Sequence, residues 1–405
     1  MPLIKRITDF FASPKGRISG LWLSYFLYWG SIAPFIPYVG IYYDSIGLTG
    51  SQIGTLNSVR AIVSFISAIA IAFVTDVLRR RKLVFVLCIV GMIVALVIFP
   101  FAASFITLLP VIALYSAFQA PAIAILDQDT LSTLENPRNF SKVRVGGSYG
   151  WGSIIFFAGL ILDRPGTPLQ IIFMLHIGLL VVLLGLVAFL PKSSPHANAK
   201  KASIKDVAAL FRHPGFALWM GIIFLFGMAE ASLINFLFLH IRDIGGSASL
   251  MGLAMTFAIL GEIIGFNLAK RVQGRIGSRR MIVLAFAFRT LWYLLIAANP
   301  VPLLVLPIQI LGGGSFSLIE AGSVAYVNER APGRIGTTAQ GVRSSILLRL
   351  SAAVGSLFSG AIYQRSGSAR MYLIMAGVST VSFILAALLR RAERQREAAA
   401  NPSPQ

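Results

Sequence analysis

The feature that most constrains this chain is the alternation of long apolar spans with short polar turns, of which only every second one is basic. Of its 405 residues, 56% are apolar and only 12% are charged, although 35 are Lys or Arg. Twelve apolar spans reach the roughly 20 residues that a helix needs to cross a bilayer. They cover residues 19–43, 52–75, 83–101, 105–130, 143–162, 169–190, 214–240, 249–270, 280–298, 302–325, 340–362 and 370–389. The sequence therefore predicts an all-α integral membrane protein with twelve transmembrane helices.

The basic residues predict the orientation of these helices. Twenty-eight of the 35 lie in the N-terminal arm, the alternate turns, the central segment and the tail. The opposite turns hold only Arg164, Arg242, Arg365 and Arg370. Since basic residues accumulate in cytoplasmic loops, we expect both termini in the cytoplasm and the chain in the plasma membrane, which is the inner membrane in a bacterium. The net charge of +20 is thus a sign of topology. Nucleic-acid binding is disfavoured because the charge is spread over short loops.

No metal, cofactor or catalytic site is suggested by the sequence. The single cysteine, Cys88, and four scattered histidines show no spacing typical of metal ligands. No pattern of nucleophile and base is present either. We therefore expect a protein that is not an enzyme and that uses no cofactor or metal.

The two halves of the chain resemble each other. Ile46–Gly54 (IGLTGSQIG) lines up with Ile244–Gly252 (IGGSASLMG), 198 positions later. Gly159–Gly166 (GLILDRPG) lines up with Gly360–Gly367 (GAIYQRSG) at an offset of 201. The repeat predicts two pseudo-symmetric six-helix bundles. We expect the N-terminal bundle at residues 1–190, a cytoplasmic linker at 191–213, the C-terminal bundle at 214–391 and a disordered cytoplasmic tail at 392–405.

Twelve spans in two halves joined by a basic linker resemble the major facilitator superfamily. The turn after the second span, Asp76–Lys82 (DVLRRRK), is similar to a loop signature of that superfamily, although it lacks a glycine before the last arginines. The resemblance implies a cytoplasmic gate loop, which here consists of Asp76, Arg79, Arg80 and Arg81. The second-half copy has Gly274 where Asp76 would fall.

A narrower resemblance covers most of the chain. The segments Ile46–Gly54, Lys142–Ser148 (KVRVGGS), Gly261–Ile264 (GEII) and Gln309–Leu311 (QIL) are similar to the branch of phenylpropionate permeases and nucleoside:proton symporters. That branch is related to the lactose permease. The resemblance implies secondary active transport, with a substrate site between the halves that opens alternately to each side.

Ionisable residues inside the spans are the candidates for substrate binding and proton coupling. A charge at bilayer depth is costly, so it normally faces the bundle interior and has a partner. The candidates are Asp127, Arg144, Glu230, Glu262, Arg289, Glu320 and Arg343. Arg60 and Arg349 are weaker candidates, because long arginine side chains can reach the interface.

Three pairs of these residues lie at equal depth on consecutive antiparallel spans. They are Glu262 with Arg289, Asp127 with Arg144, and Glu320 with Arg343. Static salt bridges or cytoplasmic gate locks are the alternatives to a role in coupling. Asp127 and Asp129 point about 200° apart on a helix, so only one can face a central cavity. We favour Asp127, because the family resemblance implies an acidic residue there, and Asp129 would then be solvated.

These features favour a transporter of small organic solutes that is coupled to protons by symport. The interior arginines favour an organic or aromatic acid, and nucleosides or sugars come next. Proton-antiport efflux of drugs or metabolites is the main alternative, and a membrane sensor without transport activity is a weaker one. The expected partners are the small-molecule substrate, protons and the lipid bilayer, with no nucleic acid, and the protein is expected to be a monomer.

Overall fold

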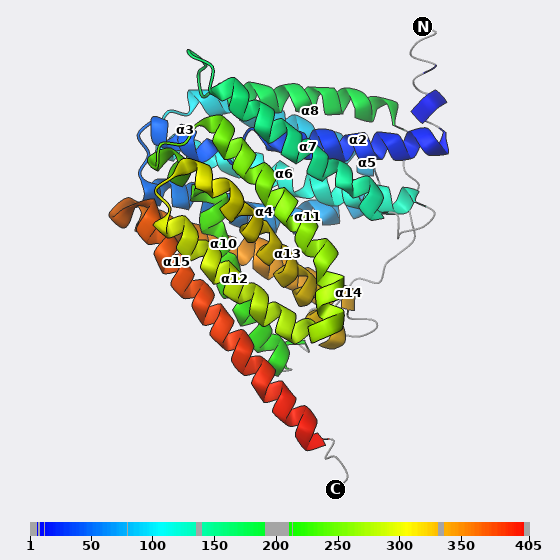
Figure 1. The fold of residues 1–405 in the computed structure, drawn as a ribbon. Helices are drawn as coiled ribbons and strands as arrows, with labels where there is room; N and C mark the ends of the chain where they lie inside the picture. Colours follow the sequence, from blue (N-terminus) through cyan, green and yellow to red (C-terminus); the bar gives the residue numbers. More distant parts are fainter. Residues whose placement is uncertain are drawn as a thin grey trace. The chain divides into compact units, whose positions relative to one another are not determined.

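All regular secondary structure in the part of the chain that the structure describes is helical (Figure 1). The computed structural model describes residues 6, 9–11, 13–78, 80–134, 140–190, 210–212, 214–330 and 336–400. Most of the predicted linker therefore lies outside the described residues.

The chain divides into two compact units. Unit 1 consists of Met1–Ala199 and Gly245–Thr256, and unit 2 of Lys200–Ile244 and Phe257–Gln405. The boundary between the two units runs through the helix Ala248–Ile276. The first residues of this helix therefore belong to unit 1 and the rest to unit 2.

Unit 1 contains seven α-helices among its described residues that lie wholly within it. They are α2 (Pro14–Ile32), α3 (Val39–Ser45), α4 (Gly50–Leu78), α5 (Arg81–Ile98), α6 (Phe105–Thr133), α7 (Phe140–Leu162) and α8 (Ile171–Phe189). The first predicted span is split between α2 and α3 by a turn at residues 33–38. This turn contains Pro34 and Pro37, which supply no backbone N–H and disfavour a continuous helix.

Small residues bring α7 against α2. A Cβ atom at Gly150 would lie 2.1 Å from the carbonyl oxygen of Phe26, and one at Gly146 would lie 2.5 Å from that of Trp22. Only glycine leaves room for this approach, which is a common way for membrane helices to pack. The contact fixes the start of α7, which carries Arg144, beside the aromatic residues of α2.

Unit 2 is built from helices that follow one another along the chain much as those of unit 1 do. They are α10 (Pro214–Asp243), α11 (Ala248–Ile276, shared with unit 1), α12 (Ser278–Ala298), α13 (Val305–Arg330), α14 (Gly336–Ser345), a π-helical turn (Ile346–Leu350) and α15 (Ser351–Ala400). Here α11 packs on α13 through glycines. A Cβ atom at Gly313 would lie 1.9 Å from the carbonyl oxygen of Ala258, and one at Gly261 would lie 2.2 Å from that of Ile310. The Gly312–Gly314 run is thus a helix-packing site.

The backbone supports the internal repeat. Gly47 and Gly245, which are equivalent in the two halves, have φ angles of 82° and 87°. Gly166 and Gly367 are also equivalent and have φ angles of 78° and 77°. Glycine adopts these left-handed angles without the steric cost that other residues meet. The two halves therefore turn their chains in the same way at the same places.

Ten helices among the described residues are long and apolar enough to cross a membrane. Two features separate this number from the twelve predicted spans. The helix α2 is not among the ten, and the last predicted spans fall in one stretch, Ala339–Gln395, that is interrupted only at Gly367. The all-α membrane class holds, whereas the count of twelve and the cytoplasmic location of the termini stay predictions.

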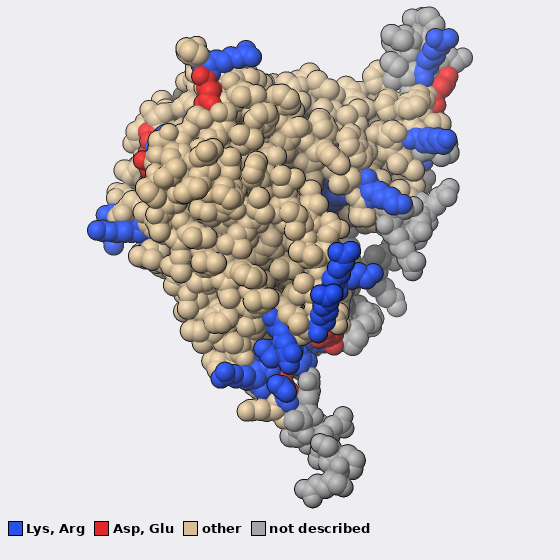
Figure 2. All heavy atoms as spheres, viewed as in Figure 1, with Lys and Arg blue, Asp and Glu red and all other residues tan. Residues whose placement is uncertain are grey.

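The C-terminal helix continues beyond the predicted bundle boundary, because α15 is helical through Ala400. Glu393 is 9% exposed, accepts a hydrogen bond of 2.7 Å from the hydroxyl of Tyr326 and forms ion pairs with Arg279 and Arg330. These contacts hold the start of the predicted tail as helix, while residues 401–405 lie outside the described ones. Figure 2 shows basic side chains gathered around this end of α15.

Candidate functional site

The most completely bonded charge in unit 2 is Arg289 on α12. Its side chain is 1% exposed, and its Nε donates a hydrogen bond of 2.7 Å to Glu230 Oε1 on α10. One terminal nitrogen bonds Glu230 Oε2, and the other donates to the carbonyl of Gly312 at 2.8 Å. The pair is therefore bidentate and buried, which is the strongest geometry available to an arginine and a carboxylate.

Aromatic rings enclose this pair. The hydroxyl of Tyr293 donates to Glu230 Oε1 at 2.9 Å. The guanidinium of Arg289 lies 4.5 Å from the ring centroid of Trp292 and 5.4 Å from that of Tyr293. Cation–π contacts of this kind stabilise a desolvated arginine. The charge of Arg289 is thus neutralised within unit 2 without a ligand.

A second carboxylate of unit 2, that of Glu262 on α11, differs from Glu230 in its contacts. It lies within electrostatic range of Arg289 and of Glu230. It forms no hydrogen bond or ion pair with any residue that the structure describes, and its side chain is half-buried. A carboxylate in a membrane span normally has a partner. Glu262 is therefore the residue of this site that remains available to a proton or a ligand.

The predicted pairing of Glu262 with Arg289 is not found, since Arg289 bonds Glu230 instead. The depth comparison considered only consecutive spans, whereas α10 and α12 are separated by α11. Glu230 is among the predicted candidates, but the comparison of depths gives it no partner. The tyrosine that completes the pair was missed, although Tyr293 follows Arg289 by four residues and so shares its helix face.

The predicted pair of Glu320 and Arg343 is formed. Both terminal nitrogens of Arg343, on α14, donate to the carboxylate of Glu320, on α13, at 2.7 Å. Gln340 accepts a further hydrogen bond of 2.9 Å from Arg343 Nε. The arginine is 6% and the carboxylate 26% exposed, so the pair is bidentate but less buried than that of Arg289.

In unit 1 the predicted pair of Asp127 and Arg144 is present but loose. Arg144 Nε lies 3.9 Å from Asp127 Oδ1, and the two side chains are 39% and 34% exposed. The hydroxyl of Tyr25 donates a hydrogen bond of 2.6 Å to the same oxygen of Asp127. Arg144 is therefore only partly neutralised, and its hydrogen-bonding nitrogens have room for another acceptor.

Aromatic residues surround Arg144. Its guanidinium lies 5.4 Å from the ring centroid of Trp29 and 5.8 Å from that of Tyr25. Trp29 in turn packs edge-on against Trp151, with centroids 6.1 Å apart. The indole nitrogen of Trp29 is buried without a hydrogen-bond acceptor. The cluster combines a cation with flat apolar faces, which suits a planar organic anion.

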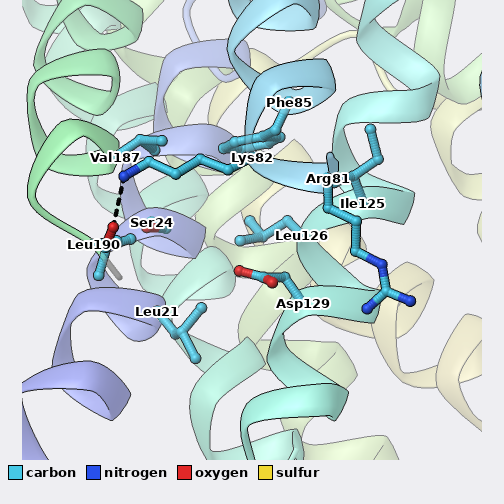
Figure 3. A pocket seen from close by; sticks show the side chains of 10 residues that line it. All are labelled: Leu21, Ser24, Arg81, Lys82, Phe85, Ile125, Leu126, Asp129, Val187 and Leu190. Carbon is cyan, nitrogen blue, oxygen red and sulfur yellow. Dashed lines mark hydrogen bonds between the residues drawn. The ribbon is translucent and has the colours of Figure 1, made fainter. Parts of the chain in front are cut away.

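Asp129 lies in a separate pocket of unit 1, shown in Figure 3. Its carboxylate borders the pocket together with Arg81 and Lys82 at the start of α5. The Nζ of Lys82 donates to the carbonyl of Leu190 at 2.6 Å and so caps the end of α8. Asp129 is thus half-buried beside basic groups, where solvation had been expected.

The predicted gate loop is only partly described. Arg80 precedes α5, and Arg81 is its first residue. Arg79 and the side chain of Asp76 lie outside the described residues. The cytoplasmic gate loop implied by the family resemblance therefore stays a prediction. No group of three or more His, Cys, Asp or Glu side chains that could hold a metal occurs in the described part of the chain.

The helices and their interior charges define a class, which is a polytopic membrane transporter. A family match supports this assignment over residues 19–374, and the chain belongs to the MFS_1 like family. It is therefore a multi-pass integral membrane protein that transports small solutes.

Two relatives align over nearly the whole chain. The probable 3-phenylpropionic acid transporter of Escherichia coli (strain K12) is 25% identical over 380 residues, covering 90% of this chain and 95% of that protein. The maltose permease of Geobacillus stearothermophilus is 26% identical over 375 residues, covering 92% and 94%.

A solved structure shows the same fold. A mutant of the nucleoside transporter NupG superposes with a TM-score of 0.83 at 18% identity, covering 92% of this chain and 99% of that one. The family match and the two relatives confirm the predicted resemblance to the major facilitator superfamily, and the first relative agrees with the predicted phenylpropionate branch.

Proposed function

We propose that this protein is a proton-coupled symporter of a small organic anion, with an aromatic carboxylate as the favoured substrate. The observation that carries the proposal is Glu262, a half-buried carboxylate in a membrane helix without a hydrogen bond or ion pair among the described residues. Such a group can change its protonation state without breaking an internal bond. Glu262 is proposed as the proton carrier.

The substrate class follows from unit 1. Arg144 has a long and half-exposed contact with Asp127, so a substrate carboxylate can replace that contact with a bidentate one. The rings of Trp29 and Trp151 offer apolar faces to an aromatic substrate. The relative that is a probable 3-phenylpropionic acid transporter supports this choice, because that acid carries both a carboxylate and an aromatic ring.

Two of the other candidate arginines, Arg289 and Arg343, are less suited to bind substrate. Arg289 and Arg343 already form bidentate bonds with carboxylates of their own unit. Removing such a partner from a buried arginine is costly. We therefore assign to Glu230, Arg289, Glu320 and Arg343 the role of holding the helices of unit 2 around Glu262.

Uptake into liposomes tests this proposal. The purified protein would be reconstituted and given radiolabelled aromatic acids, nucleosides or sugars, with the outside more acidic than the lumen. We expect accumulation of an aromatic acid that collapses when a protonophore is added. We expect Glu262→Gln to lose accumulation, while Glu329→Gln, a half-exposed carboxylate at the end of α13, keeps it.

Four results would contradict the proposal. Uptake that ignores the proton gradient would indicate a facilitator, and export driven by the gradient would indicate an antiporter. Uptake of sugars or nucleosides in preference to acids would remove the assignment of Arg144 to a substrate carboxylate. A Glu262→Gln protein that accumulates substrate normally would remove Glu262 from the coupling step.

A further inference from the structure

Two neighbouring helices of unit 2, α12 and α15, each carry a stripe of exposed apolar side chains. On α12 the stripe is 38–43% exposed and consists of Leu284, Phe288, Leu291 and Leu295. On α15 it is 47–51% exposed and consists of Val381, Ile384 and Leu388. Residues three or four positions apart share one face of a helix, so each set forms a continuous surface. In a membrane protein, such surfaces are covered by acyl chains, which are as apolar as leucine.

The two stripes lie side by side, because α12 and α15 pack against each other (Figure 1). The hydroxyl of Thr290 on α12 donates a hydrogen bond of 3.0 Å to that of Ser379 on α15. Nearer the start of α12, Arg279 Nε lies 3.2 Å from Glu393 Oε2 on α15. The first turn of α12 and the residues of α15 around Glu393 therefore meet at the same end of the unit.

Both stripes end at arginines. Arg280 lies one turn before Leu284 on α12, Arg391 lies one turn after Leu388 on α15, and both arginines are exposed. The half-buried Arg390 lies within electrostatic range of three other arginines, which are Arg280, Arg391 and Arg394. Figure 2 shows basic side chains gathered at this end of unit 2. These four cations from two helices form one group, the arginine cluster.

The acidic residues at this end do not neutralise the arginine cluster. Glu393 is 9% exposed and forms its ion pairs with Arg279 and Arg330. Glu329 Oε2 lies 3.8 Å from a terminal nitrogen of Arg330. No member of the arginine cluster forms an ion pair with a side chain that the structure describes. Because like charges that are held together repel each other, an anion from outside the unit stabilises the cluster.

We propose that the arginine cluster and the two apolar stripes form a binding site for an anionic phospholipid. The arginines bind the phosphate of the headgroup, whose oxygens match the two parallel N–H donors of a guanidinium. The acyl chains lie along the stripes of α12 and α15. Basic groups between helix ends on the cytoplasmic side of a membrane protein bind such headgroups, and this end of unit 2 is the predicted cytoplasmic one.

Both parts of the site contribute to the choice of ligand. A soluble phosphate would contact the arginines but would leave the stripes uncovered. A phospholipid without net charge would cover the stripes but would leave the positive charge of the cluster uncompensated. A phospholipid with a net negative charge satisfies both parts. The inference is independent of the proposed substrate and of proton coupling, because none of these residues belongs to the candidate transport site.

Native mass spectrometry of the protein in detergent tests the site, because it resolves the number of lipids that are bound. The purified protein would be titrated with phosphatidylglycerol and, separately, with phosphatidylcholine that carries the same acyl chains. We expect phosphatidylglycerol to bind at the lower concentration. The double variant Arg280→Gln with Arg390→Gln should need about 10-fold more phosphatidylglycerol for the same occupancy, because two of the four charges are lost.

The matched control removes two arginines from a neighbouring basic segment. Arg271 and Arg275 are exposed on α11, and neither is among the charges within electrostatic range of Arg390. The double variant Arg271→Gln with Arg275→Gln loses the same charge and should bind phosphatidylglycerol as the unaltered protein does.

A second variant and a thermal measurement separate lipid binding from folding. Arg391→Gln with Arg394→Gln changes two exposed positions of α15 and should weaken binding in the same way. Without added lipid, all three double variants should unfold at the temperature of the unaltered protein.

Three outcomes would overturn the site. Equal binding of phosphatidylglycerol and phosphatidylcholine would show that the arginines do not bind the headgroup. Equal losses of binding in the cluster variants and in the α11 control would show that overall charge, and not this cluster, attracts the lipid. Displacement of bound phosphatidylglycerol by an equal concentration of glycerol phosphate, which has no acyl chain, would show that the cluster binds soluble phosphates. A failure of the proposed symport in liposomes would leave the lipid site unaffected.

Discussion

Both units place an arginine against a carboxylate inside their helices, but the two pairs are built in opposite ways. In unit 2, Arg289 and Glu230 are 1% and 9% exposed and share a bidentate contact. In unit 1, Arg144 and Asp127 are 39% and 34% exposed and approach only to 3.9 Å. The two pairs look alike in the sequence, as charges inside apolar spans.

The difference shows which arginine a ligand can use. Arg289 donates to Glu230 and to the carbonyl of Gly312, so a substrate anion would have to break bonds that no water can replace. Arg144 has a single long contact in a half-exposed position, where an ion pair contributes little free energy. A substrate carboxylate can therefore take the place of Asp127 at small cost. We assign a structural role to the tight pair and substrate binding to the loose one.

The largest expected effect comes from breaking the tight pair. Glu230→Ala leaves Arg289 charged and buried without its carboxylate, and we expect the free energy of unfolding to fall by about 3–5 kcal/mol. Thermal unfolding in detergent, followed by the loss of the monodisperse peak, measures this change. Asp127→Ala, the matched change in unit 1, should lower the free energy by less, about 1–3 kcal/mol, most of it from the buried hydroxyl of Tyr25 that loses its acceptor.

A double variant checks the physical reason. Glu230→Gln combined with Arg289→Gln removes both charges, so no buried charge is left without its counterion. We expect the double variant to be more stable than Glu230→Gln alone. Equal losses of stability from Glu230→Ala and Asp127→Ala would show that the two pairs do not differ in the way the contacts indicate.

The next effect is on transport and not on stability. Arg144→Gln removes the charge that we assign to the substrate carboxylate, and a charge-assisted hydrogen bond contributes about 1.5–3 kcal/mol. Initial uptake at low substrate concentration should therefore fall by about 10-fold or more. The unfolding temperature should stay close to that of the unaltered protein, because the lost ion pair with Asp127 is weak.

A control in the other half makes this result specific. Arg365→Gln lies in a turn outside the predicted spans and should leave uptake unchanged. If Arg144→Gln takes up substrate normally, or if it unfolds at a much lower temperature, the assignment of the loose pair to substrate binding is wrong.

The helical membrane class could be predicted from the sequence because apolar span length and basic turns reflect the bilayer itself. The repeat was equally readable, since it depends on glycines such as Gly47 and Gly245 whose backbone angles agree. The division of the first span was harder to place. Pro34 and Pro37 disfavour a continuous helix, but they do not mark its ends, since the helix ends at Ile32 and resumes at Val39.

The partners of buried charges were predictable only between consecutive spans. Depth along a hairpin identified Glu320 with Arg343 and Asp127 with Arg144, because a turn fixes the register of its two helices. Depth along a hairpin could not pair Glu230 with Arg289, because α10 and α12 are not consecutive and come into contact only when the whole unit packs. Nor could depth reveal how tight a contact is, because that depends on burial and on neighbours such as Tyr293.

The smallest expected effect concerns a carboxylate held by backbone amides instead of an arginine. Asp163, which follows α7 in unit 1, accepts hydrogen bonds of 2.8 and 2.9 Å from the amides of Ala248 and Ser249 at the start of α11. Burial alone would raise the pKa of Asp163, but these bonds and those from nearby serine hydroxyls together lower it. The folded state therefore holds fewer protons at this site than the unfolded state.

The sign of the pH dependence follows from this lowered pKa. The contribution of Asp163 to stability is complete above its ordinary pKa of about 4 and disappears as the pH falls through the lower value of the folded protein. Asp163→Asn should thus unfold at a slightly lower temperature than the unaltered protein at neutral pH, and the gap should close in strong acid. A gap that stays constant with pH would mean that the amides bind the side chain without sensing its charge. Charge would then matter for stability only where an arginine is its partner, as in the two pairs above.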